Sequence, residues 1–289
     1  MIERTSHDVE WFIPDPTSPV RQGDVLINRL PGADRIEETC IVITADCDIS
    51  KGKFGRHLAC LRVVRLHDYI KTTWASKKLT KARKDETEKV RSQVAKWHTK
   101  LLDSESKLTL DGTVSWIRRE SPIDLCNALC VPDDERGKFV ICIKALRDAF
   151  IAVDKVAHRE ELSQLVQFRA VIQNFPIEQV YQKTLQQAQQ EPLPDDTFFL
   201  PGLPQLEDIP VVVLLREIVG VPHEAVHYRA TDAWSDGSFL RIGRLQPMFK
   251  YAISQAFGTL YARIGLSQDY ETRCRCAIDN IGTLPWDPS

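Results

Sequence analysis

The sequence lacks the features of a membrane, secreted or zinc-finger protein. Its longest apolar run, residues 209–215, is interrupted by Pro210 and is far shorter than the ~20 residues that span a bilayer. The first residues are polar and contain no apolar signal-peptide core. The eight cysteines include no Cys-x-x-Cys pair, which a zinc finger requires. We therefore expect a cytoplasmic protein that makes no membrane contact and holds no structural metal.

The charge balance also lacks a strong bias. The net charge of the 289 residues is −2, so neither nucleic acid nor an anionic surface would attract the chain as a whole. Hydrophobic residues make up 43% and charged residues 27%, which are ordinary fractions for a globular protein. A chain of this length can form two cores, and any attraction to a charged partner must be local.

The order of apolar segments predicts an α+β protein in three parts. Short strands at residues 25–28, 39–44 and 57–66 indicate a small β-barrel over residues 1–70. Residues 71–190 are predicted to be a long helical insertion with a few strands, at 112–118 and 139–143. A Gln-rich stretch followed by prolines places a boundary near residue 191. Residues 191–289 are predicted to be mainly helical, with a buried strand at 211–215 and a helix at 247–264 that packs on the barrel.

A local excess of positive charge lies in residues 77–107, where ten Lys and Arg face five Asp and Glu. Val90, Val94, Trp97 and Leu101 recur at helical spacing, so the segment is predicted to be an amphipathic helix. Its basic face is either simply solvated or contacts a protein partner or nucleic acid. The residues predicted to contact nucleic acid are Lys81, Arg83, Lys84 and Arg91.

The segment Thr44-Ala45-Asp46-Cys47-Asp48 ends an apolar strand and is the most pointed chemical feature. In an extended chain, Asp46 and Asp48 would point to the same side and could bind Mg²⁺ or Mn²⁺. The alternatives are a turn, or a buried polar network in which Arg241 or Arg244 neutralises the carboxylates. Cys47 is a poor candidate nucleophile because anionic neighbours suppress the thiolate.

Residues 22–66 resemble the small barrel of the MazF/PemK-type toxin ribonucleases. The resemblance is carried by Gly23-Asp24 before a strand, then Arg35, then the apolar strand that ends at Asp46. It implies an SH3-like barrel and a ribonuclease in which Arg35 is catalytic. Ile36 stands where the family has a proline, and the expected serine or threonine after the next strand has no clear counterpart.

The Asp46 segment and residues 243–266 together are similar to poorly characterised bacterial proteins found near phage-defence genes. From this similarity and the residues above, we expect an accessory or regulatory binding protein of a phage-defence or stress system that is not catalytic. The alternative is an enzyme, either a metal-dependent phosphodiesterase using Asp46 and Asp48 or a MazF-like ribonuclease using Arg35.

Overall fold

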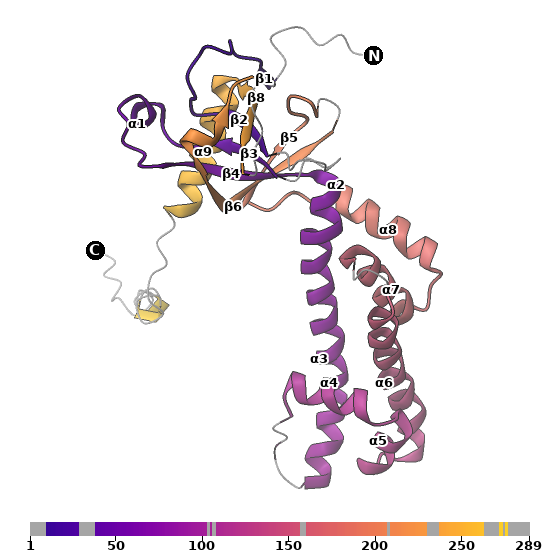
Figure 1. The fold of residues 1–289 in the computed structure, drawn as a ribbon. Helices are drawn as coiled ribbons and strands as arrows, with labels where there is room; N and C mark the ends of the chain where they lie inside the picture. Colours follow the sequence, from indigo (N-terminus) through magenta and orange to yellow (C-terminus); the bar gives the residue numbers. More distant parts are fainter. Residues whose placement is uncertain are drawn as a thin grey trace, which may run out of the picture. The chain divides into compact units, whose positions relative to one another are not determined.

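The computed structural model describes residues 10–28, 38–102, 105, 108–156, 160–206, 209–229, 237–262, 272–273 and 275–276 (Figure 1). The chain forms two compact units. Unit 1 combines the two ends of the chain, Met1–Val63 and Leu193–Ser289, and unit 2 is the continuous segment Val64–Pro192. The boundary expected near residue 191 lies beside the end of unit 2.

Unit 1 is built on an eight-stranded sheet whose strands follow the order β1-β8-β2-β3-β4-β6-β5, with β7 paired to β8. The strands are β1 (Trp11–Phe12), β2 (Asp24–Asn28), β3 (Glu38–Val42), β4 (His57–Arg65), β5 (Thr197–Leu200), β6 (Val211–Pro222), β7 (Val226–His227) and β8 (Phe239–Leu245). The helices of this unit are α1 (Asp46–Ser50), the 3₁₀ turn η3 (His223–Ala225) and α9 (Pro247–Tyr261).

The central strand β2 joins the two ends of the chain, because it pairs antiparallel with β3 on one side and with β8 on the other. Both faces of the sheet are buried. Val25 and Ile27 of β2 belong to one hydrophobic cluster, and Leu26 between them belongs to another on the opposite face. Burial on both faces explains why these strands read as continuous apolar runs in the sequence.

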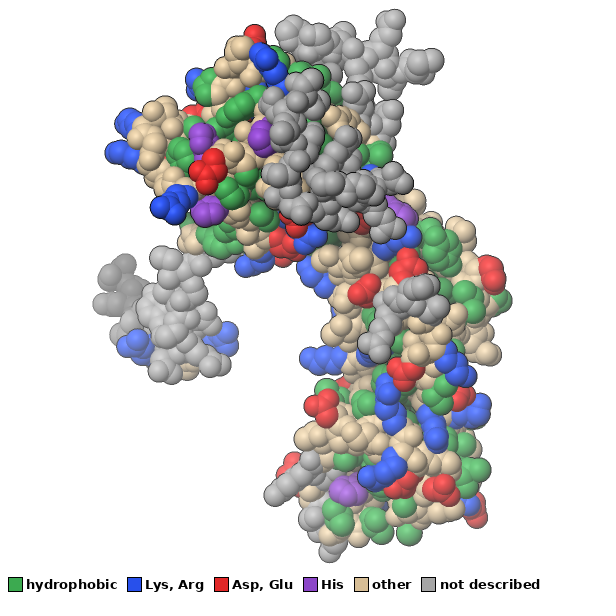
Figure 2. Space-filling view, in the orientation of Figure 1, with side chains coloured by type: hydrophobic (Ala, Val, Ile, Leu, Met, Phe, Trp, Pro, Cys, Tyr) green, Lys and Arg blue, Asp and Glu red, His purple; other side chains and the backbone are tan. Residues whose placement is uncertain are grey.

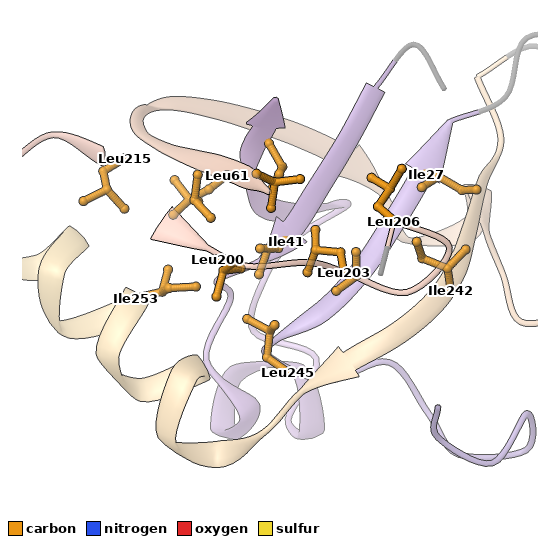
Figure 3. Close-up of a cluster of buried hydrophobic side chains, with 14 of the residues drawn as sticks. Ile27, Ile41, Leu61, Leu200, Leu203, Leu206, Leu215, Ile242, Leu245 and Ile253 are labelled. Atoms are coloured by element: carbon orange, nitrogen blue, oxygen red, sulfur yellow. The ribbon is translucent and has the colours of Figure 1, made fainter. Parts of the chain in front are cut away.

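Helix α9 covers one face of the sheet (Figure 3). Pro247 occupies its first turn, where the missing N–H costs nothing. Ile253 and Leu260 are buried in the cluster that also holds Ile41 and Leu203. The predicted helix at 247–264 is therefore present, and its described part ends at Tyr261.

After the last two residues of β4, every described secondary-structure element of unit 2 is a helix. Its elements are α2 (Leu66–Tyr69), the π-helical turn η1 (Ile70–Trp74), α3 (Ala75–Leu102), α4 (Leu110–Arg119), α5 (Pro122–Ala128), α6 (Asp133–Asp154), α7 (Glu161–Gln173) and α8 (Ile177–Gln190). Helix α3 packs on α4, α6 and α7, and α7 also packs on α8 (Figure 1). Within α3, Val90, Val94 and Trp97 are buried as predicted, whereas Leu101 is half-exposed.

The strands predicted at 112–118 and 139–143 are wrong, because both segments are helical. Thr109 caps α4 by accepting a hydrogen bond from the Gly112 amide at 3.0 Å, and Thr113 and Ile117 are buried one turn apart. Residues 139–143 lie inside α6, whose buried residues continue at helical spacing to Val153. A short apolar window could not distinguish the two structures.

Two further expectations about the fold need correction. The C-terminal part is not mainly helical, because β5, β6, β7 and β8 precede its one long described helix, α9. The chain combines helices with a β-sheet as expected, but the described strands form an open path from β1 to β5 rather than a closed barrel. Among the described helices, none is long and apolar enough to cross a bilayer.

Candidate functional site

Three residues of the sequence-predicted site, Asp46, Arg241 and Arg244, contact a tight turn, Gln22-Gly23-Asp24, at the start of β2. Gly23 has φ +87°, and a Cβ atom there would lie 3.1 Å from the Lys250 side chain. The positive φ favours glycine, and a Cβ atom would also force the Lys250 side chain to shift. The Gly23 amide donates to the Val42 carbonyl at 2.8 Å, which fixes the turn against the end of β3.

Asp24 is the centre of the first charged network. Its side chain is 0% exposed, and Arg244 binds it with two nitrogens, including Nη2 to Oδ2 at 3.1 Å. Arg241 Nη1 lies 3.6 Å from Oδ2, and the Arg21 amide donates to the same oxygen at 2.9 Å. The register explains the contact, because Asp24 of β2 stands opposite Arg244 of β8. The carboxylate is therefore neutralised within the core.

Arg241 extends the network to the segment that precedes β2. Its side chain is 2% exposed and donates to the carbonyls of Ser18 and Asp15, each at 2.9 Å. The guanidinium also lies 4.7 Å from the ring centroid of Tyr228. Burial lowers the pKa of Arg241 from its ordinary value, although the charge of Asp24 acts in the opposite direction. Arg241 therefore anchors residues 15–18 to β8.

Asp46 is the centre of the second network and begins α1. Its Oδ1 accepts the Gln22 amide at 2.9 Å, and its Oδ2 accepts Lys250 Nζ at 2.8 Å. Gln22 Nε2 donates to Ser254 Oγ at 2.8 Å. Partial burial acts to raise the pKa of Asp46, but the bonds from Lys250 and Gln22 outweigh it and hold the pKa below its usual value. This network joins α1, the start of β2 and α9.

The prediction that Arg241 or Arg244 neutralises Asp46 and Asp48 is wrong. Both arginines bind Asp24, and Lys250 is the partner of Asp46. Sequence reasoning missed Asp24 and Lys250 as network members. Asp24 had a signal in the Gly-Asp pair before the strand, whereas Lys250 had none beyond its place in a basic segment.

The paired-carboxylate geometry is also wrong. Asp46, Cys47 and Asp48 form the first turn of α1, so their backbone is helical rather than extended. Residues two apart on a helix point about 200° apart, and the carboxylates of Asp46 and Asp48 do not face one point. Thr44 serves the backbone instead, since its Oγ1 accepts the Ala59 amide at 2.7 Å.

The rest of the chain that the structure describes contains no metal-binding geometry either. No group of three or more His, Cys, Asp and Glu side chains there is arranged to hold a metal ion. Cys47 is exposed, with its Sγ 3.8 Å from Asp48 Oδ1. Arg35, the catalytic arginine that the toxin resemblance implies, lies outside the described residues.

The four cations predicted to contact nucleic acid from α3 occupy different environments. Lys81 and Lys84 are exposed and make no hydrogen bond or ion pair among the described residues. Arg91 binds Glu88 within the helix. Arg83 is half-buried, its Nε has no hydrogen-bond partner in the described structure, and burial lowers its pKa. The basic face is therefore smaller than the sequence predicts.

Sequence reasoning missed a second basic feature, the basic loop, which we define as residues 51–57 (Lys-Gly-Lys-Phe-Gly-Arg-His). It runs from the end of α1 to the first residue of β4. Gly52 has φ +64° and ends α1; its amide donates to the Ile49 carbonyl at 3.1 Å, and the Lys53 amide donates to the Asp48 carbonyl at 2.8 Å. These two bonds form a Schellman helix end, which the sequence signals by a glycine after a short helix.

Comparison of the chain with protein-family models, curated proteins and solved structures gave no match. The resemblance of residues 22–66 to the MazF/PemK toxins therefore stays a prediction.

Proposed function

We propose that the chain is a non-catalytic binding protein that acts as an accessory or regulatory component of a bacterial phage-defence or stress system. The observation that carries the non-catalytic part is the occupation of both Asp46 oxygens, by Lys250 Nζ at 2.8 Å and by the Gln22 amide at 2.9 Å. A carboxylate that holds three elements together is committed to structure.

The same geometry argues against the phosphodiesterase alternative. Mg²⁺ requires several oxygen ligands that converge at short distance. The ammonium group of Lys250 already occupies the position next to Asp46 Oδ2 where such an ion would have to bind. Asp48, on the other side of the helical turn, cannot supply a second ligand at the same point. The alternative that uses Arg35 has no support among the described residues.

The binding part of the proposal rests on the surface of unit 2 and on the sequence resemblances. Lys81 and Lys84 are exposed, unpaired cations on α3, where a protein partner or nucleic acid would meet them. The similarity of the Asp46 segment and residues 243–266 to proteins near phage-defence genes supports the bacterial context. Comparing phage plating on cells with and without the gene tests this context, and equal plating together with equal survival of stress would contradict it.

The decisive experiment compares Asp46→Asn with Asp48→Asn by calorimetric titration with Mg²⁺ and Mn²⁺ and by urea denaturation. We expect no saturable metal binding by the wild-type chain. Asp46→Asn should lower the free energy of unfolding by about 1–3 kcal/mol, because it removes charge-assisted hydrogen bonds that are only partly exposed. Asp48→Asn, the matched control, should leave stability near that of the wild type.

Saturable binding of either metal by the wild type, lost in both folded variants, would contradict the proposal. So would metal-dependent cleavage of RNA or DNA that both variants lose.

A further inference from the structure

The basic loop is held in a fixed conformation at both of its ends. The Schellman bonds fix its start, and the His223 amide donates to the Arg56 carbonyl at 3.1 Å near its end. Phe54 packs against the cluster that contains Leu58 and Val221, and its ring lies 5.2 Å from the ring of His223. The side chains of the loop are therefore presented from a rigid base.

The cationic side chains of this loop take no part in the hydrogen bonds and ion pairs described for the fold. Lys51, Lys53 and Arg56 are exposed, and among the described residues their side chains make no hydrogen bond or ion pair. The imidazoles of His57 and His223 are exposed beside them. Figure 2 shows Lys, Arg and His side chains gathered on the side of unit 1 where Figure 1 draws α1, with acidic side chains next to them.

The acidic groups near the loop do not cancel its charge. Asp48 is half-buried in α1, and Glu217 of the adjoining strand β6 binds Arg62 at 3.2 Å. Glu224 in η3 is the exposed acid beside His223. Three unpaired cations therefore face two carboxylates that have no ion-pair partner among the described residues, Asp48 and Glu224, which leaves a small local surplus of positive charge in a chain whose net charge is −2.

We infer that the basic loop binds the phosphate backbone of nucleic acid. Exposed cations gain little from one small anion in water, because the high dielectric weakens each pair. A polyanion that carries condensed counterions is different, since each cation that contacts a phosphate releases a counterion. An acidic peptide has a lower charge density than nucleic acid and gains less from this release.

The residues of the loop also determine which groups of a nucleic acid it can contact. Its aromatic residue, Phe54, is partly buried against the hydrophobic cluster of the sheet and is therefore committed to packing rather than to stacking on a base. Backbone phosphates are then the groups that Lys51, Lys53 and Arg56 reach. Binding is expected to be independent of base sequence and strongly dependent on salt.

The test uses the full chain and measures fluorescence anisotropy with a labelled mixed-sequence DNA duplex and a single-stranded RNA. Three phosphate contacts predict a slope of log K against log salt of about −2.7 on duplex DNA, or roughly a 40-fold loss of affinity from about 50 to 200 mM salt. The variant Lys51→Ala/Lys53→Ala/Arg56→Ala should weaken binding at low salt by tenfold or more and flatten this slope toward zero.

The matched control removes three exposed lysines of unit 2 that are not assigned to binding, as Lys77→Ala/Lys138→Ala/Lys155→Ala, and it changes the net charge by the same amount as the loop variant. This control should bind like the wild type. Unchanged binding by the loop variant, or loss of binding only in the control variant, would overturn the inference. So would equal binding to polyglutamate at matched charge, because the loop would then recognise acidic chains in general.

This inference rests on the proposed binding function. Repeating the same titrations in Mg²⁺ distinguishes failure of the inference from failure of the proposed function. Intact nucleic acid after binding supports both. If the wild type cleaves nucleic acid and both the loop variant and Asp46→Asn lose that cleavage, the proposed non-catalytic function is overturned. The basic loop would still stand as the binding site. Absence of binding would overturn the site and leave the non-catalytic function standing.

Discussion

Replacing Asp24 with asparagine keeps the volume of the side chain and removes its charge. Arg241, 2% exposed, and Arg244, 12% exposed, would then lie in the core opposite a neutral amide. Removing one partner of a buried ion pair costs about 3–5 kcal/mol, because the remaining charge stays desolvated. The free energy of unfolding of an ordinary protein is about 5–15 kcal/mol, so we expect Asp24→Asn to destabilise unit 1 strongly.

Hydrogen exchange measured by mass spectrometry suits this prediction, because it reports on unit 1 separately from the helices of unit 2. Peptides from β2 and β8 should lose roughly 100- to 5,000-fold protection where exchange follows global opening, since 1.4 kcal/mol corresponds to a factor of ten. Glu217→Gln is the control, because its pair with Arg62 is about half exposed and contributes no more than about 1 kcal/mol. Equal effects of the two substitutions would refute the assignment of Asp24 as a buried charge centre.

Two further predictions concern pH and helix orientation. The pKa of folded Asp46 is lowered, so its contribution to stability is present above the unfolded value of about 3.9 and is lost as pH falls through the folded pKa. Acid titration of unfolding should therefore be shallower below about pH 5 for Asp46→Asn than for the wild type, and identical curves would contradict the ion pair with Lys250. In α6, Ile143 is 0% and Ile141 is 69% exposed, so Ile143→Ala should cost about 2–5 kcal/mol in urea denaturation and Ile141→Ala within about 0.5 kcal/mol. Similar costs would indicate a strand, in which both side chains share one face.

The parts of the fold that were predicted correctly are those fixed by local pattern. The strands at 25–28, 39–44 and 57–66 contain continuous apolar residues because the sheet is buried on both faces. The helix from Pro247 carried an N-terminal proline and a regular apolar stripe, and those signals agree with one another.

The errors arose where a short segment was compatible with two structures. Residues 139–143 are apolar in an unbroken run, and only the longer spacing to Val153 identifies α6. Asp46-Cys47-Asp48 was read as extended because it follows a strand, but the turn at Gly52 ends a helix that begins at Asp46.

The charge networks were beyond the reach of sequence pattern for a different reason. Asp24 and Arg244 are 220 residues apart, and only the pairing of β2 with β8 brings them together. Lys250 reaches Asp46 across 204 residues in the same way. Any acid in unit 1 could have been assigned to any base until that register was known. The basic loop carries a local signal in its glycines and cations, but this signal is weaker than the excess of ten Lys and Arg over five Asp and Glu in residues 77–107.

The pairing of β2 with β8 has a consequence for how the chain is made on the ribosome. Unit 2 is one continuous segment, so it can fold as soon as it has emerged. β2 must wait for β8, and at a synthesis rate of about 5–20 residues per second the 220 residues between Asp24 and Arg244 correspond to roughly 10 to 45 seconds. During that interval β2, β3 and β4 present their apolar faces and an unpaired edge, so we expect the nascent chain to depend on a chaperone that protects these surfaces from aggregation.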